Sequence, residues 1–251
     1  MKSLLLSITL MTFTLSALAR DVVFVHGNAK DMRYWTQVEN GLAKDVSKVS
    51  KNVFYANYLT EDEIRAPFKN YHKPLFYEKI KEEFDKSDSD EITVIAHSFG
   101  VTLTLATLEY YNLWHRVKKI ISFAGALRGL ESCRPIGPYN AQVPTCYGQS
   151  RKNPYVFGFF PGSGRINDWT ASYYYSFINM PRQHRDIEFI SISIGRDDSL
   201  ICRNAFFSNR CSKSALFNEY GNVRNYVFEN QGLDHFTLPN RIDRNFVMSL
   251  L

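Results

Sequence analysis

The chain has 251 residues, of which 45% are hydrophobic and 22% charged, and its formal net charge at neutral pH is +5. This length and composition fit one globular domain with a sizeable core, and they exclude a largely disordered chain. Because no dense run of lysine and arginine occurs, we expect no nucleic-acid partner. The weak positive charge is compatible with transient contact with an anionic membrane or particle surface, although solvated surface charge explains it more simply, and the oligomeric state stays open.

The first 19 residues predict a signal peptide. Lys2 precedes an apolar run over 4–18, and the run ends in Ala17-Leu18-Ala19, a small-x-small pattern typical of cleavage after Ala19. A transmembrane anchor is the alternative, but the apolar run is shorter than the ~20 residues that a membrane span needs. We therefore expect a secreted or periplasmic protein whose mature part, residues 20–251, forms one domain.

Cysteine usage agrees with export, because all four cysteines follow the signal segment. They form two couples that are close in sequence: Cys133 with Cys146, and Cys202 with Cys211. Three pairings can be drawn, and we favour these two couples because each closes a short loop. A zinc site is the alternative explanation, but the spacings lack the Cys-x-x-Cys pairs of zinc folds. We therefore expect two disulfides and no metal.

The mature chain opens with an apolar strand that ends in a glycine turn, His26-Gly27-Asn28. This strand reads as central and buried. Alternation of helix and strand follows, which is typical of an α/β fold with a mostly parallel sheet and helices on both faces. We expect a helix over 35–46, a strand over 52–58, an unassigned segment over 59–73, and a helix over 74–86 whose core stripe is Phe76, Ile80 and Phe84.

The central motif is a strand, a sharp turn and a helix. β-branched residues over 92–95 predict a buried strand, and residues 101–111 predict a helix. Between them lies Ala96-His97-Ser98-Phe99-Gly100. Small residues two positions on either side of a serine are what a strained nucleophile elbow needs to avoid collision. The alternative is an ordinary N-capping serine at a helix start.

After a further strand over 117–125 the pattern becomes irregular between Leu127 and Arg185. Such a long stretch without periodicity indicates a functional insertion, either a lid or a substrate platform. Exposed aromatic side chains there would bind an apolar surface, and the alternative is a small separate core under a long loop. The aromatic residues are Tyr155, Phe157, Phe159, Phe160, Trp169, Tyr173, Tyr174, Tyr175 and Phe177.

A late strand over 187–194 leads into Gly195-Arg196-Asp197-Asp198. An acid just after a late strand is where an α/β-hydrolase carries the carboxylate that orients a histidine. We choose Asp198, because Ile201 three positions on can anchor the loop, and we keep Asp197 as the alternative. The remaining elements are a strand over 225–229, a loop over 232–236 and a short helix from about residue 239.

Of the six histidines, His235 alone follows the last strand in a glycine-containing loop. It gives the chain order Ser98, Asp198, His235, which is the α/β-hydrolase order of nucleophile, acid and base. Backbone N–H groups of Asn28 and Phe99 would form the oxyanion hole. We expect the other histidines to be surface residues (His72, His115, His184) or structural neighbours of the donors (His26, His97).

These motifs resemble a known family. The Ala-His-Ser-x-Gly elbow and the strand-His-Gly opening resemble small bacterial secreted lipases of the α/β-hydrolase superfamily. The second half is similar to a lipase-like extracellular polyhydroxybutyrate depolymerase in Arg128 to Cys133, in Pro144 to Cys146, in Phe157 to Pro161, in Asp198 with both later cysteines, and in His235-Phe236. That resemblance supports Asp198 as the acid, because the family's acid also stands four positions before a cysteine. This chain is shorter through several loops.

The resemblance implies carboxylic ester hydrolysis more firmly than it implies a polymer substrate. We therefore expect a serine hydrolase, a lipase or esterase that cleaves apolar esters through an acyl-enzyme without a cofactor. A polyhydroxyalkanoate depolymerase is the first alternative. An acyltransferase with the same triad and a non-catalytic binding protein on the same scaffold remain further alternatives.

Overall fold

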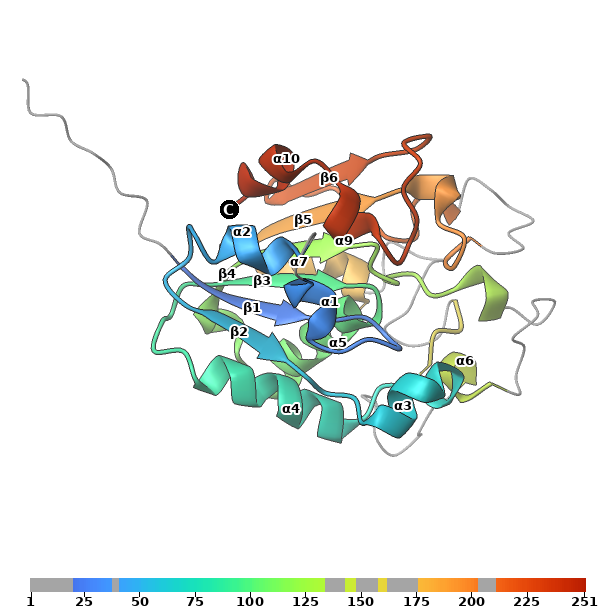
Figure 1. Ribbon diagram of the computed structural model, residues 1–251, viewed down its shortest axis with the longest axis horizontal. Coiled ribbons are helices and arrows are strands. Elements are labelled where there is room, and N and C mark those ends of the chain that lie inside the picture. Colours follow the sequence, from blue (N-terminus) through green and yellow to red (C-terminus); the bar gives the residue numbers. More distant parts are fainter. Residues whose placement is uncertain (1–19, 38–40, 134–142, 148–157, 162–175, 203–210) are drawn as a thin grey trace, which may run out of the picture.

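A computed structural model describes residues 20–37, 41–133, 143–147, 158–161, 176–202 and 211–251, so the expected signal peptide lies outside the described residues. The described strands form one sheet in the order β2-β1-β3-β4-β5-β6, and every neighbouring pair is parallel (Figure 1). The expected parallel sheet and the interior place of the first strand are confirmed. The strands are β1 Asp21–Val25, β2 Val53–Ala56, β3 Ile92–His97, β4 Val117–Phe123, β5 Glu188–Ser193 and β6 Val223–Val227.

Side chains alternate between the two faces of each strand, so the sheet supports a core on either side. Val23 and Val25 of β1 pack toward α4 (Pro74–Asp85) and α5 (Phe99–Tyr110). Val22 and Phe24 pack toward α1 (Arg33–Thr36), α2 (Leu42–Val46), α9 (Leu238–Arg241) and α10 (Arg244–Met248). Figure 1 shows these two helical layers, with α4 and α5 on one side of the sheet. Among the helices in the described ranges, none combines the length and apolar character needed to cross a bilayer.

The two long helices follow from their sequences. Helix α4 begins at Pro74, which lacks the N–H that a first helical turn would leave without a partner, and its stripe of Phe76, Ile80 and Phe84 is fully buried as expected. Helix α5 is buried along almost its whole length. Its buried threonine hydroxyls each donate to a main-chain carbonyl three or four residues back, so α5 tolerates full burial (Thr102, Thr104 and Thr107).

Two predicted helices are broken in the structure. The helix expected over 35–46 is wrong as a single element: α1 ends at Thr36, before the extended Gln37, and α2 starts after Gly41. A β-carbon at Gly41 would lie 2.5 Å from the carbonyl oxygen of Trp35, so only glycine fits this turn. The helix expected from about residue 239 is likewise two helices, separated by an extended Ile242.

Short helices lie in the segments that connect the strands. Helix α3 (Glu61–Arg65) lies in the segment that the sequence left unassigned, and Thr60 with Glu63 forms a capping box at its start. The others are η1 Pro67–Lys69, η2 Trp114–Arg116, η3 Glu131–Cys133, α6 Pro144–Tyr147, η4 Phe177–Asn179, α7 Met180–Gln183 and η5 Gly195–Asp197. Disulfides join Cys133 to Cys146 and Cys202 to Cys211, the two short-loop couples.

Candidate active site

Ser98 lies at the carboxyl end of β3, where the chain turns directly into α5. Its backbone has φ 53° and ψ −122°, a conformation that a residue with a β-carbon rarely adopts. The Ser98 N–H donates to the carbonyl oxygen of Phe123 at 2.8 Å, which fixes the turn against the end of β4. The strained turn that the sequence predicts at this serine is therefore present.

The small residue two positions after the serine, Gly100, has a clear steric cause. A β-carbon at Gly100 would lie 2.3 Å from the carbonyl oxygen of His26 and 2.7 Å from that of Val25. Both are main-chain atoms of β1 and its following loop, so they cannot move aside as a side chain could. A β-carbon at Gly27 would lie 2.8 Å from Nδ1 of His97 and 3.1 Å from the β-carbon of Ser98. The elbow and the loop after β1 therefore pack backbone to backbone.

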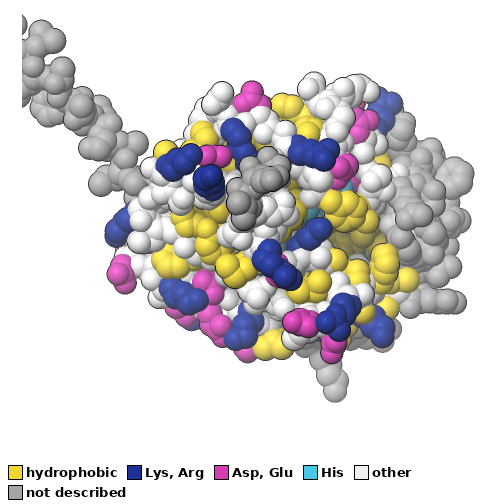
Figure 2. Space-filling view, in the orientation of Figure 1, with side chains coloured by type: hydrophobic (Ala, Val, Ile, Leu, Met, Phe, Trp, Pro, Cys, Tyr) yellow, Lys and Arg dark blue, Asp and Glu magenta, His cyan; other side chains and the backbone are white. Residues whose placement is uncertain are grey.

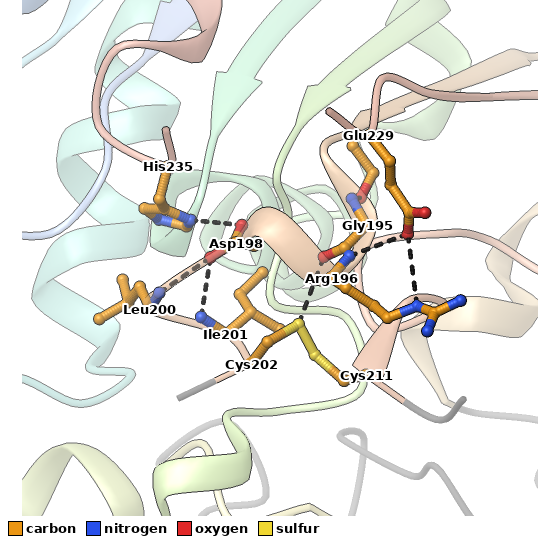
Figure 3. Close-up of a disulfide and its surroundings, with 10 residues drawn as sticks. Gly195, Arg196, Asp198, Leu200, Ile201, Cys202, Cys211, Glu229 and His235 are labelled. Carbon is orange, nitrogen blue, oxygen red and sulfur yellow. Dashed lines mark hydrogen bonds and ion pairs between the residues drawn. A yellow bond between two sulfur atoms is a disulfide. The ribbon is translucent and has the colours of Figure 1, made fainter. Parts of the chain in front are cut away.

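His235 bridges Ser98 and Asp198. Its Nε2 lies 2.8 Å from Oγ of Ser98, and its Nδ1 lies 2.7 Å from Oδ2 of Asp198. The Asp198 carboxylate can only accept, so Nδ1 carries the hydrogen and Nε2 is free to accept from the serine hydroxyl. The other carboxylate oxygen accepts from the N–H groups of Leu200 and Ile201 at 3.1 and 2.8 Å. Figure 3 shows Asp198 held between His235 and these two N–H groups.

The structure brings Asp198, and not Asp197, to the histidine. Asp197 is exposed and accepts from the main-chain N–H of Asn230, in the turn after β6. Asp198 and His235 are each 1% exposed, whereas Ser98 retains 6%. The Cys202–Cys211 disulfide follows at once, and the N–H of Cys202 donates to the carbonyl oxygen of Asp198 at 2.8 Å. Burial and hydrogen bonds together fix the Asp198 carboxylate.

Asn28 stands beside Ser98, and its side chain is held at both ends. Its amide nitrogen donates to the carbonyl oxygen of Pro67 at 2.8 Å, and its amide oxygen accepts from the buried Asn70 at the same distance. The next residue, Ala29, has φ 58°, so the loop turns sharply here. Asn28, Ser98 and Phe99 line one cavity. The expected oxyanion residues therefore lie next to the serine, on a loop anchored through Asn70.

The histidine that precedes this loop is also built into the structure. The ring of His26 stacks on Tyr58 with ring centroids 4.3 Å apart, and the Tyr58 hydroxyl donates to the carbonyl oxygen of His26 at 2.7 Å. Burial lowers the pKa of His26 to about 4. His26 is therefore neutral at physiological pH and serves the packing of the loop after β1.

His97, inside the elbow, is buried and neutral. Its Nε2 lies 2.7 Å from the main-chain carbonyl oxygen of His235, and its ring stacks on Tyr34. Burial is the main cause that lowers the pKa of His97 well below its ordinary value, and the neighbouring His235 lowers it further. The expected structural role of His97 thus takes the form of a direct link between the elbow and the loop that carries His235.

The expectation that His72 is a surface residue is wrong. Its side chain is fully buried, with Nε2 3.1 Å from the Thr102 hydroxyl and Nδ1 3.2 Å from the Tyr77 hydroxyl. Its ring also contacts Phe99, Phe159 and Phe177. The prediction failed because the sequence neighbours of His72 are polar, and they suggest an exposed position. His115 is exposed as expected, and His184 is half-buried against Trp114.

An apolar cavity of about 190 Å³ opens beside Ser98. Figure 2 shows hydrophobic side chains, in yellow, over much of the visible face, some of them beside a histidine side chain in cyan. Two aromatic side chains of its lining, Phe68 and Phe236, are 48% and 45% exposed. The lining residues are Asn28, Ala29, Pro67, Phe68, Ser98, Phe99, Ala126, Leu130, Cys133, Val143, Thr145, Cys146, Phe159, Leu200 and Phe236.

The aromatic residues between Leu127 and Arg185 divide in two. Phe159 and Phe177 are buried in the core, and Phe159 also lines the cavity beside Phe99. Most of the others lie outside the described residues (Tyr155, Phe157, Trp169, Tyr173, Tyr174 and Tyr175). For Phe159 and Phe177, neither exposure nor a small separate core describes the structure, because both belong to the main core that also contains Val23 of β1.

Sequence reasoning missed the residues that support the site from a distance. Asn70 holds Asn28 across 42 positions of the chain, and Tyr58 holds His26 across 32. No local pattern marks either residue. A signal did exist for the neighbouring α3, because Thr60-Glu61-Asp62-Glu63 is a capping-box sequence.

No protein-family model matches the chain, and no curated protein matches it in sequence. Solved structures do match. The mature lipase BlEst2 of Bacillus licheniformis has a TM-score of 0.52 at 14% identity, with 93% of this chain and 92% of that chain covered. Polyneuridine aldehyde esterase has a TM-score of 0.51 at 14% identity, covering 92% of this chain and 98% of the other. Aspergillus fumigatus lipase B has a TM-score of 0.52 at 15% identity, with 91% of this chain and 56% of that chain covered.

At these identities the likeness concerns the fold. Two of the matches cover 93% and 92% of this chain, and the parallel sheet with its helices agrees with these α/β-hydrolase structures. The chain therefore has the α/β-hydrolase fold.

Proposed function

We propose that this protein is a serine hydrolase that cleaves carboxylic esters, with Ser98 as nucleophile, His235 as general base and Asp198 as the orienting acid. The observation that carries the proposal is the unbroken chain from Ser98 Oγ through His235 to Asp198, at 2.8 and 2.7 Å. A serine hydroxyl is a weak nucleophile on its own, so an adjacent base within hydrogen-bond distance is what ester attack requires. The lipases and esterases among the structural matches support the same class.

In the first half-reaction, Ser98 Oγ attacks the ester carbonyl carbon while its proton passes to Nε2 of His235. The carbonyl oxygen becomes an oxyanion, and the N–H groups of Asn28 and Phe99 would donate to it. Removal of one such donor typically costs about 3 kcal/mol of transition-state stabilisation. The tetrahedral intermediate collapses when the carbon–oxygen bond to the alcohol breaks, and His235 returns the proton to the leaving alkoxide oxygen.

In the second half-reaction, water takes the place of the alcohol. His235 accepts a proton from the water as its oxygen attacks the acyl carbon, and the proton then returns to Ser98 Oγ as the carboxylic acid leaves. Asp198 stabilises the imidazolium in both steps without itself becoming protonated. Reaction of the acyl-enzyme with an alcohol instead of water would make the protein an acyltransferase.

The apolar cavity beside Ser98 supports an apolar substrate, either a lipid, a small ester or a polyester. Two disulfides fit folding in an oxidising compartment, which agrees with export through the proposed signal peptide over residues 1–19. Under this proposal the protein acts in the periplasm or outside the cell. The proposed insertion over about 127–185 would supply one side of the substrate site.

The test compares residues 20–251 of the wild type with Ser98→Ala, both with disulfides formed. Substrates are p-nitrophenyl esters, tributyrin and amorphous polyhydroxybutyrate. We expect hydrolysis by the wild type and a loss of roughly 10⁴-fold or more in Ser98→Ala. Equal inactivity of both proteins on every ester would refute the proposal. Turnover of the polyester at a rate similar to that of tributyrin would identify a depolymerase.

A further inference from the structure

The cavity beside Ser98 lies on one side of the proposed nucleophile. Among the described residues, Ser98, Asn28 and Phe99 line it, whereas the His235 side chain does not. If the proposed mechanism holds, the leaving alcohol must face Nε2 of His235, because that atom returns the proton. The alcohol therefore lies outside the cavity, and the arm of the ester that enters it is the acyl chain.

One wall of this cavity is cross-linked. The Cys133–Cys146 disulfide joins two of its lining residues. The N–H groups of Phe159 and Phe160 donate to the carbonyl oxygens of Thr145 and Cys146 at 2.7 and 2.9 Å. Three separate segments of the chain are therefore joined along this wall.

This wall is also closely packed. A β-carbon at Gly158 would lie 2.4 Å from the main-chain carbonyl carbon of Cys146, so the two backbones touch. The Thr145 hydroxyl donates to the carbonyl oxygen of Pro67 at 2.9 Å, and the same oxygen accepts from Asn28. The wall and the loop that carries Asn28 are thus both anchored to the carbonyl oxygen of Pro67. A wall tied by a disulfide, hydrogen bonds and backbone contact does not yield readily to a longer ligand.

The volume sets the size of the group that fits. A closed apolar cavity of about 150 Å³ is known to bind benzene, a molecule of six carbon atoms. By proportion, the cavity of about 190 Å³ accommodates roughly seven or eight carbon atoms. Its lining is almost entirely apolar, and the Val143 and Leu130 side chains contribute to it. A charged or strongly polar acyl group would lose its hydration there without replacement.

We infer that this cavity is an acyl-binding site that accepts short to medium apolar acyl chains, up to roughly eight carbon atoms, and discriminates against longer ones. The inference rests on the proposed ester hydrolysis and adds the substrate class to it. Esters of butanoic to octanoic acid are the expected substrates. Esters of long-chain fatty acids are disfavoured because they exceed the cavity volume and the cross-linked wall does not yield readily to enlarge it.

The experiment measures kcat/KM of the wild type for p-nitrophenyl butanoate, octanoate and dodecanoate. A second series of butanoate esters varies the alcohol from ethyl to dodecyl. We expect dodecanoate to be at least about tenfold poorer than octanoate, since pockets reject an unaccommodated methylene by factors of this order. The alcohol series should show a much weaker dependence on chain length.

Variants test whether the cavity wall causes the limit. Val143→Ala and Leu130→Ala enlarge the cavity and should raise the ratio of dodecanoate to butanoate turnover several-fold, whereas Val143→Phe should lower the ratio of octanoate to butanoate. A ratio measured within one variant does not depend on how much of the protein is folded. Leu75→Ala, at a side chain 51% exposed on α4, is the matched control and should change neither ratio.

Each of the following results would overturn the inference. One is a wild-type kcat/KM for dodecanoate equal to or above that for octanoate. Another is a set of cavity variants that all keep both ratios at their wild-type values. A chain-length limit in the alcohol series instead of the acyl series would assign the cavity to the alcohol. Inactivity of wild type and Ser98→Ala on all esters would overturn the proposed hydrolysis as well, whereas Ser98-dependent activity on long chains would overturn the size limit alone.

Discussion

The Nε2 atom of His97 donates a hydrogen bond to the main-chain carbonyl oxygen of His235, 2.7 Å away. A carbonyl oxygen only accepts, so His97 carries its hydrogen on Nε2. Its Nδ1 is buried without a hydrogen-bond partner among the described residues, and faces the position that a β-carbon of Gly27 would occupy. His97, which precedes Ser98, therefore holds the backbone of His235, and the His235 side chain contacts the Ser98 hydroxyl.

Loss of this donor should slow turnover without weakening substrate binding. In His97→Leu the loop that carries His235 loses its link to β3, and displacement of a catalytic group by about 1 Å or less lowers kcat by up to about 100-fold, so we expect a loss of about 10- to 100-fold. We expect KM to stay within about twofold because His97 is not part of the cavity lining. Steady-state kinetics on p-nitrophenyl butanoate measure both constants.

Conservative variants separate positioning by His97 from bulk packing. The amide nitrogen of glutamine reaches about as far as Nε2 of histidine, whereas that of asparagine reaches only as far as Nδ1. His97→Gln should therefore retain most of the wild-type kcat, and His97→Asn should resemble His97→Leu. Equal kcat values in all three variants would show that the hydrogen bond to His235 does not matter for turnover.

The two adjacent aspartates should differ sharply in their effect on activity. Asp198→Asn removes the carboxylate that holds Nδ1–H of His235, and we expect kcat to fall by about 10⁴-fold. Asp197→Asn changes an exposed side chain that accepts only from the Asn230 N–H, so kcat should stay within about threefold. A larger loss in Asp197→Asn than in Asp198→Asn would contradict the assignment of the acid.

Gly100 offers a test of the close contact between α5 and the loop after β1. In Gly100→Ala the new methyl group meets two main-chain oxygens, so the free energy of unfolding should fall by about 1–3 kcal/mol. Gly221→Ala is the control, because no described atom lies within 4 Å of a β-carbon there. Urea unfolding followed by circular dichroism measures both variants, and equal midpoints would disprove the clash.

Acid should destabilise the protein through its buried histidines. The pKa of His26 falls from 6.5 to about 4 on burial, and burial also lowers that of His97. Between pH 4 and pH 6.5, His26 is protonated in the unfolded chain but neutral in the folded one. The contribution of His26 to stability is therefore full above pH 6.5 and declines as the pH falls toward 4. For His26 alone the decline is about 3 kcal/mol.

Urea unfolding at pH 7.0, 5.5 and 4.5 measures this decline. His26→Phe keeps a ring to stack on Tyr58 but cannot be protonated, so its loss of stability between pH 6.5 and 4 should be smaller than that of the wild type. His115→Gln changes an exposed side chain and should follow the wild type. Identical pH dependence in His26→Phe and the wild type would exclude His26 as a contributor.

The residues of the candidate site could be predicted because each follows a strand. Ser98 comes directly after β3, Asp198 follows β5 by a short turn, and His235 follows β6. The carboxyl ends of parallel strands meet at one edge of a sheet, so local pattern was enough to predict that these three side chains gather. The strand boundaries were less accurate, since β6 begins two residues before the expected position.

Residues that depend on tertiary contacts could not be predicted in this way. His72 lies between Tyr71 and Lys73, and its sequence neighbours suggest exposure, yet the fold buries it against Phe99 and Phe159. The partnership of Asn70 with Asn28 has no periodic or spacing signal at all. The burial and the partners of such residues depend on long-range packing, which local patterns in a single sequence do not predict.

The order of the strands has a consequence for how activity returns after denaturation. Ser98 and His235 are 137 positions apart, and His235 follows β6, which is at the edge of the sheet. Pairings between distant parallel strands form late because the chain between them must first be ordered. Recovery of the proposed ester hydrolysis should therefore lag behind the recovery of helical signal, and that activity would report the docking of β6.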